Sequence, residues 1–221
     1  MKSRSDRSAA TRERILQAAK HLFAKQGYAA TGMRQIAGRA GVSLAMINYH
    51  FGSKQKLLLE LLDSFFSGIE RLAKVNLAGT EPPEEKIRRH IKTMCEMLER
   101  ETELLQVALL ELPRDQPEVL EFKAERMRRV AGLFARHLLP VVNMRRGRPL
   151  RLEVAGPAIG AMVFSHFLLR PLVERVFDGR FNKEFYAALP EQLAELALGG
   201  LLGVQANRKE GQDGTVRRSD G

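Results

Sequence analysis

Apolar residues recur at helical spacing through most of this sequence, and this periodicity constrains the fold more than any other feature. In residues 11–26 the apolar positions are Ile15, Ala18, Ala19, Leu22 and Phe23. Such spacing places them along one face of an α-helix. Later segments are rich in Leu, Ala, Glu and Arg and contain few runs of β-branched residues. The sequence therefore predicts an all-α protein.

Turn and cap residues divide the N-terminal part into three helices. The first runs over residues 11–26. Thr31 is expected to cap a second helix that ends at Gly41, and Ser43 is expected to cap a third over residues 44–50. Only about three residues separate the last two helices, which is the length of the sharp connection in a helix-turn-helix.

The rest of the chain divides into further helices at serine and proline residues. Ser53 begins a long helix, and Pro83 and Pro117 each open another. The closing segments, 152–178 and 190–203, are apolar on more than one face, and a single chain of this size cannot bury both. We therefore expect a homodimer in which these segments pair with those of a second copy about a two-fold axis.

Positive charge is concentrated at the N-terminal end. Residues 1–56 hold eleven Lys and Arg against two acidic residues, so they carry +9 of the total formal charge of +10. A basic end on a nearly neutral body is typical of a protein that binds a polyanion. A solubilising tail and an anionic membrane surface are the alternative interpretations.

The short third helix carries side chains suited to DNA. In a helix-turn-helix the second helix of the motif enters the major groove. Asn48 can donate to and accept from an adenine edge, while Leu44, Ala45 and Met46 offer apolar contact to a thymine methyl. The expected phosphate contacts come from hydroxyl, aromatic and basic residues nearby. They are Thr31, Arg34, Tyr49, His50 and Lys54, and Ser43, at the start of the third helix, completes the candidate DNA-binding residues.

The stretch TGMRQIAGRAGVSLAMINYHFGSKQKLL closely resembles the DNA-binding signature of the TetR family of transcriptional regulators. The resemblance is strong over residues 11–60. It implies a three-helix DNA-binding domain followed by a helical ligand-binding and dimerisation domain. It also implies a dimeric repressor that binds a palindromic operator and is released by a small effector. Asn48, Ala45 and Gly32 depart from the usual pattern, so no operator sequence is carried over from the family.

Together these features suggest four parts: a disordered basic arm (1–10), a helix-turn-helix domain (11–55), a helical regulatory and dimerisation domain (56–203) and a disordered tail (204–221). Within the regulatory domain several side chains are candidates for an apolar or amphipathic effector, although each is also an ordinary core residue. These candidates are Phe66, Met94, Met97, Phe122, Met162 and His166.

The sequence gives little support to other classes of protein. We find no phosphate-binding loop, nucleophile elbow or zinc-binding histidine motif, so neither an enzyme nor a metal or cofactor is expected. Cys95 is the single cysteine, and either a buried small residue or a redox sensor would account for it. The basic N-terminus lacks an apolar core, and the longest uncharged run is too short to span a bilayer, so we expect a cytoplasmic protein. The remaining alternative is a helical adaptor that binds acidic lipid.

Overall fold

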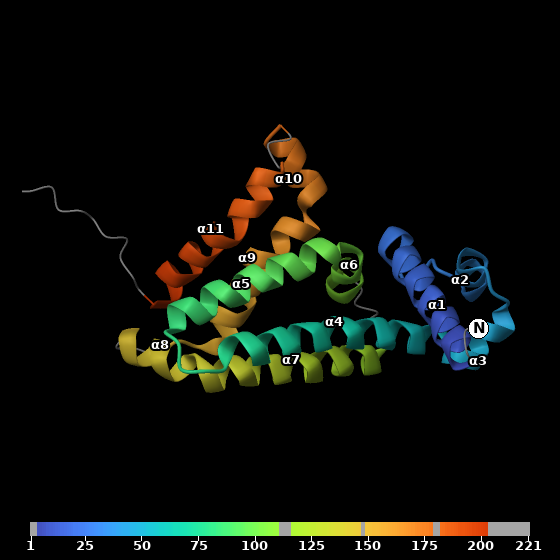
Figure 1. The fold of residues 1–221 in the computed structure, drawn as a ribbon, viewed down its shortest axis with the longest axis horizontal. Helices are drawn as coiled ribbons and strands as arrows, with labels where there is room; N and C mark the ends of the chain where they lie inside the picture. Colours follow the sequence, from blue (N-terminus) through green and yellow to red (C-terminus); the bar gives the residue numbers. More distant parts are fainter. Residues whose placement is uncertain (1–3, 111–115, 147–148, 179–181, 203–221) are drawn as a thin grey trace, which may run out of the picture.

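The computed structural model describes residues 4–110, 116–146, 149–178 and 182–202, and every regular element within these ranges is an α-helix (Figure 1). The all-α prediction is confirmed. In chain order the helices are α1 (Arg4–Gln26), α2 (Met33–Ala40), α3 (Leu44–Phe51), α4 (Lys54–Leu77), α5 (Pro83–Arg100), α6 (Thr102–Leu110), α7 (Pro117–His137), α8 (Leu139–Arg146), α9 (Leu152–Leu168), α10 (Arg170–Val176) and α11 (Lys183–Leu202).

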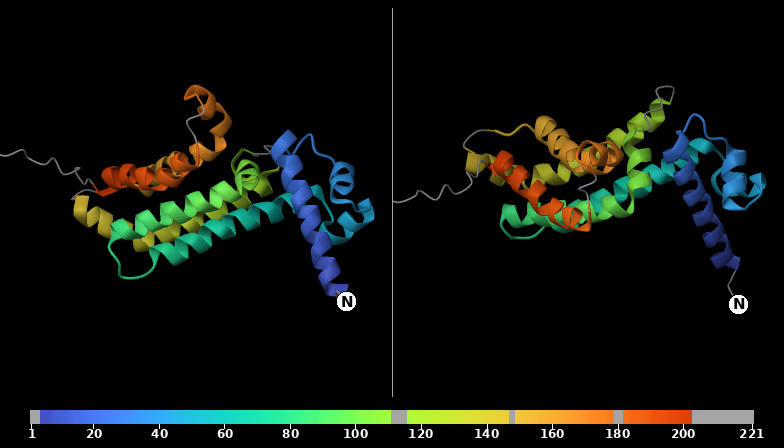
Figure 2. Two further views of the ribbon diagram at one scale, coloured as in Figure 1. Left: turned by 45° about the horizontal axis from the view of Figure 1, so that its top comes forward. Right: turned by 90° about the horizontal axis from the view of Figure 1, so that it is seen from above.

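Helices α1, α2 and α3 form a group at one end of the molecule, and α4 runs from that group into the body (Figure 1). There α4 packs against α7 and α5, and α11 packs along α5. Two further views show the same separation between the N-terminal group and the body (Figure 2). The two parts therefore share a core through the long α4 and through α6, which packs against α1.

Both ends of α4 are fixed by hydrogen bonds. At its start the Ser53 hydroxyl oxygen accepts from the backbone N–H of Lys56 at 3.2 Å. At its end the Arg89 guanidinium donates to the carbonyl of Asn76 at 2.9 Å, and the Lys86 ammonium donates to the carbonyl of Gly79 at 2.6 Å. Carbonyls of a C-terminal helix turn lack partners within their own helix, so these donors from α5 stabilise the turn after α4.

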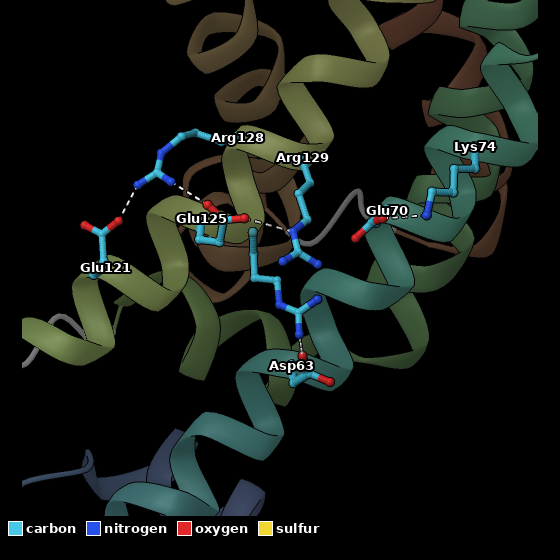
Figure 3. A network of polar contacts seen from close by, with 8 residues as sticks. Asp63, Glu70, Lys74, Glu121, Glu125, Arg128 and Arg129 are labelled. Carbon is cyan, nitrogen blue, oxygen red and sulfur yellow. Dashed lines mark hydrogen bonds and ion pairs between the residues drawn. The ribbon is translucent and has the colours of Figure 1, made fainter.

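Helix α7 braces α4 from the side. Arg126 of α7 is paired with Asp63 of α4, and the Gln55 amide donates to the Glu118 carboxylate at 3.2 Å. The outer face of α7 carries further ion pairs (Figure 3) that link Glu121, Glu125, Arg128 and Arg129. Exposed pairs of this kind contribute little stability. The buried residues on the other face of α7, such as Val119 and Val130, provide most of its packing.

The N-terminal boundary differs from expectation. Helix α1 begins at Arg4 rather than at Thr11, so residues 4–10, which we expected to be disordered, are helical. Alanines and arginines in residues 4–10 favour a helix. This segment therefore continues, towards the N-terminus, the helix whose later residues pack against the core. Residues 1–3 and the expected tail at 204–221 lie outside the described residues.

The closing segments also differ in detail. The expected continuous run over 152–178 is broken into α9 and α10, which meet at a bend of 75°. Pro171, in the first turn of α10, has no backbone N–H to donate, which accounts for a new helix starting there. Within the described ranges no single helix is long and apolar enough to cross a membrane, and α9 and α10 meet those criteria only as a bent pair.

Apolar side chains remain exposed on this end of the molecule. Leu172 and Val176 of α10 are 59% and 63% exposed, and Leu196 of α11 is 65% exposed. Leu169 and Phe177, beside α10, are also about half exposed. The single chain therefore leaves part of the closing segments uncovered.

Candidate nucleic-acid interface

Helices α2 and α3 are held by a small apolar core. Ile36, Ala37 and Ala40 of α2 are buried, as are Ile47 and Phe51 of α3. They join the cluster that includes the inner face of α1, and α3 packs against α2 and the start of α4. This packing agrees with the arrangement expected for a helix-turn-helix.

The turn between α2 and α3 follows from two residues. Gly41 has φ +64°, a left-handed conformation that glycine adopts without strain, and it ends α2. Ser43 then caps α3, because its hydroxyl oxygen accepts from the backbone N–H of Met46 at 3.3 Å. Ser43 thus has the capping role that the sequence suggested, and it is exposed at the start of α3.

One face of α3 is open to solvent. Ala45, Met46, Asn48 and Tyr49 are exposed, and Tyr49 reaches 81% exposure. Ile47, between them in sequence, is fully buried. The predicted outward residues therefore lie together on one exposed face, where they can meet a large partner. Leu44 and His50 also belong to the predicted set, and both are half-buried.

The surroundings of this face are basic. Arg34, early in α2, is exposed, as expected for a phosphate contact. Arg39 of α2 and Lys56 of α4 are also exposed basic residues, and our sequence reasoning did not select them. The charge bias of the sequence could have identified both residues, since no Asp or Glu occurs between Glu13 and Glu60. A surface with this charge favours an anionic partner.

Thr31 does not have the role predicted for it. Gly32, not Thr31, is the capping residue of α2, and the Gln35 side chain accepts from the Gly32 N–H at 2.7 Å. Thr31 is 1% exposed, and its hydroxyl donates to the carbonyl of Gly27 at 2.8 Å. This hydroxyl therefore stabilises the loop between α1 and α2 instead of facing a partner.

Lys54, which we expected to contact phosphate, has its charge engaged within the protein. Its ammonium donates to the carbonyls of Tyr28 at 2.8 Å and Thr31 at 2.9 Å. It lies 4.3 Å from the centroid of the Tyr28 ring. These contacts turn the charge towards the loop between α1 and α2.

His50 is less available than its place in the motif suggests. Its ring lies edge-on to Tyr49, with 5.2 Å between ring centroids. The Nε2 atom is shielded from solvent and has no hydrogen-bond partner among the described residues. The predicted phosphate contact of His50 stays a prediction.

Ion pairs connect this N-terminal group to the body. Arg12 of α1 is paired with Glu60 of α4. Nζ of Lys20 lies 3.0 Å from the carboxylate of Glu101, which connects α5 to α6, and Nδ1 of His21 lies 2.7 Å from the carboxylate of Glu103 in α6. Helix α1 is thus joined to α4 and α6 of the body.

The predicted effector residues are not gathered around one described hollow. Phe66 and Met94 are buried in the core, and Met97, Met162 and His166 are half-buried. Burial lowers the pKa of His166. Phe122 instead lines a surface hollow of about 450 Å³ on α7, beside Arg126. The effector site stays a prediction.

The structure offers neither a metal site among the described residues nor a reactive thiol at Cys95. No group of three or more His, Cys, Asp or Glu within the described ranges is arranged to hold a metal ion. Cys95 is buried, and burial raises the pKa of its thiol to about 12. A thiol that stays protonated is a poor nucleophile, so the geometry favours Cys95 as a packing residue.

The chain is similar to known bacterial transcriptional regulators. Residues 15–61 match the family model described as bacterial regulatory proteins, tetR family. The chain is 28% identical over 196 residues to YerO of Bacillus subtilis, an uncharacterized HTH-type transcriptional regulator, and the match covers 85% of this chain and 65% of YerO. It is 32% identical over 96 residues to the transcriptional activator FasR of Mycolicibacterium smegmatis, with 42% of each chain covered.

Solved structures share the fold. FadR of Bacillus subtilis, in complex with stearoyl-CoA, superposes with a TM-score of 0.65 at 19% identity, over 87% of this chain and 99% of FadR. The match to this chain spans about two thirds of the length of YerO and less than half of the length of FasR.

Proposed function

Because the chain belongs to the TetR family of bacterial regulatory proteins, we propose that it is a sequence-specific DNA-binding transcriptional regulator of the cytoplasm. We propose further that it is a repressor released from its operator by a small-molecule effector. We keep the residue ranges 11–55 and 56–203 as its proposed DNA-binding and regulatory domains.

One observation carries the DNA-binding proposal: α3 presents an exposed polar and apolar face within residues 14–59, a stretch that contains no Asp or Glu. Asn48 offers an amide for an adenine edge, Ala45 and Met46 offer apolar contact, and Tyr49 can reach the phosphate backbone. Arg34 adds a charge at the start of α2. A short helix braced by two others is the element that enters a major groove in this motif.

A dimer is the form in which we expect the protein to act. The exposed apolar residues of α10 and α11 support pairing of residues 152–178 and 190–203 with those of a second copy. Two copies of α3 would then meet a palindromic operator at successive major grooves, about 34 Å apart.

The effector proposed is apolar or amphipathic. The candidate residues Phe66, Met94 and Met162 come from three helices of the body and are apolar, which suits such a ligand. FadR, which shares this fold, was crystallised with stearoyl-CoA. The ligand would have to bind the released state more tightly than the DNA-bound state, because only a differential affinity shifts the equilibrium.

A footprinting experiment tests the function. The purified protein is incubated with DNA flanking its own gene and with random duplex of equal length, at several salt concentrations. We expect a protected palindrome, a preference over random DNA and a steep loss of affinity with salt. Candidate fatty acids and acyl-CoA compounds are then added, and the loss of protection identifies an effector.

The same experiment separates the alternatives. Binding to anionic vesicles with no preferred DNA sequence would favour the adaptor interpretation. A transcription assay with the protected promoter distinguishes a repressor from an activator such as FasR. The relatives are named as transcriptional regulators, which supports the expectation that the protein is not an enzyme.

A further inference from the structure

The ammonium of Lys54 is fully engaged inside the protein. It donates to the carbonyls of Tyr28 and Thr31 at 2.8 and 2.9 Å, and the carbonyl of Ala29 lies at 3.5 Å. An ammonium group has three N–H donors. Three backbone carbonyls from one loop therefore account for all of them, and the Tyr28 ring covers the charge as well.

The loop that Lys54 binds leads directly into α2. Thr31 is its last buried residue, and Met33 begins the helix. Lys54 is itself the first residue of α4, immediately after the turn that ends α3. One side chain therefore ties the start of α4 to the start of α2, and α3 lies between these two points in the chain.

Lys56 provides an internal comparison two residues further along the same helix. It is exposed, and its ammonium makes no hydrogen bond or ion pair within the part of the chain that the structure describes. The two lysines have the same charge and lie in the same turn of α4. Only Lys54 is directed into the loop.

We propose that Lys54 is a positioning residue that fixes α3 for DNA, and that it is not a phosphate contact. This inference rests on the proposed function, because it concerns how α3 meets its operator. To reach a phosphate the ammonium would have to leave three carbonyls, and those carbonyls would lose a charged donor. Without Lys54 the loop and α2 can shift relative to α4, so α3 no longer fits the groove reliably.

Two matched variants test this, Lys54→Met and Lys56→Met. Each removes one positive charge and keeps an unbranched side chain. Affinity is measured for the operator and for random duplex as a function of salt, well below the temperature at which either variant unfolds, and thermal unfolding is recorded in parallel.

For Lys54→Met we expect operator affinity to fall at least about tenfold, while affinity for random duplex falls less than about twofold. The slope of log affinity against log salt should stay at the wild-type value, because no phosphate contact is lost. The melting temperature should fall by a few degrees. Lys56→Met should leave the melting temperature and the preference for operator unchanged.

Two results would overturn the proposal while leaving DNA binding intact. If Lys54→Met weakens operator and random duplex equally and reduces the salt slope by about 0.9, Lys54 is a phosphate contact. If the folded variant binds the operator as tightly as wild type, the contact serves stability alone. A wild-type protein without operator preference would instead refute the proposed function.

A milder variant covers the case in which Lys54→Met does not fold. Lys54→Gln removes the charge and keeps a side-chain amide that can donate to the same loop. It should lose operator preference to a smaller extent and keep the wild-type salt slope. A reduced slope in this variant would again assign Lys54 to the phosphate backbone.

Discussion

Asn48 illustrates how much a single residue can decide in this protein. It is an exposed amide at the centre of the open face of α3, whereas Ile47 and Phe51 of the same helix are buried. Because an amide can pair with adenine through two hydrogen bonds, we propose that Asn48 recognises a base.

Replacing Asn48 with alanine should relax sequence preference without abolishing binding. Discrimination at one or two base pairs should fall by about 1–3 kcal/mol, while affinity for random duplex should be unchanged. Binding to a set of operators with single substitutions provides the measurement. Ser64→Ala, which removes an exposed polar side chain from α4 outside both proposed interfaces, is the control. An unchanged preference in Asn48→Ala would show that another residue recognises the bases.

His90 predicts a dependence of stability on pH. It is buried beside Phe134, with 5.2 Å between ring centroids, and burial lowers its pKa from 6.5 to about 4. Below pH 6.5 the His90 side chain becomes protonated in the unfolded chain. In the folded chain it stays neutral until the pH falls to about 4. Stability is therefore lost as pH falls through this range, by about 2 kcal/mol at pH 5.

Urea unfolding at pH 7 and pH 5 measures this effect. His90→Gln removes the titrating group and keeps a hydrogen-bonding side chain, so it should lose less stability between the two pH values than wild type. Other groups titrate equally in both proteins and cancel in the comparison. Equal losses in wild type and variant would show that His90 does not govern the pH dependence.

At the scale of elements, the helix-turn-helix was predictable because its boundaries depend on local chemistry. Gly41 can adopt a left-handed conformation, and Ser43 can cap the helix that follows it. Both effects act within a few residues, so the sequence pattern alone located α2 and α3 to within one or two residues. The buried face of α3 followed from the same periodicity.

The roles of Thr31 and Lys54 could not be predicted, because each depends on contacts that the motif does not specify. A threonine before a helix is a good cap, but Thr31 is turned into the core, where its hydroxyl meets the carbonyl of Gly27. A lysine at a helix start suggests a phosphate contact, but Lys54 meets a loop more than twenty residues earlier in the chain. The break between α9 and α10 likewise depends on how that segment packs.

The cap of α3 can be tested by Ser43→Ala. The change removes the acceptor for the Met46 N–H and should destabilise the protein by about 1 kcal/mol. Ser64→Ala, at an exposed position inside α4, should change stability by less than about 0.5 kcal/mol. Both are measured by urea unfolding at pH 7. Equal effects would mean that the Ser43 cap contributes nothing to stability.

At the scale of the whole molecule, the proposed function requires two copies of α3 at a fixed separation. The single chain cannot provide this, and the exposed apolar residues of α10 and α11 lie far from α3 (Figure 1). Pairing at that end would hold two N-terminal groups apart at the other, with α4 connecting each group to its half of the interface. Oligomeric state and operator affinity should therefore change together.

Leu196→Glu tests this connection between the two ends. Leu196 is 65% exposed in the single chain, and a carboxylate buried there in a dimer would lack a partner, at a cost of several kcal/mol. Sedimentation should show a monomer at micromolar concentration, and operator affinity should fall far more than affinity for random duplex. Val75→Glu places the same charge on a 68% exposed residue of α4 and should leave the dimer intact.

If Leu196→Glu stays dimeric and Val75→Glu dissociates, the pairing surface lies on α4 and not on α11. If both variants stay dimeric and keep their operator preference, neither position lies within the interface, and the surface that sets the spacing of the two recognition helices must be sought elsewhere on the body.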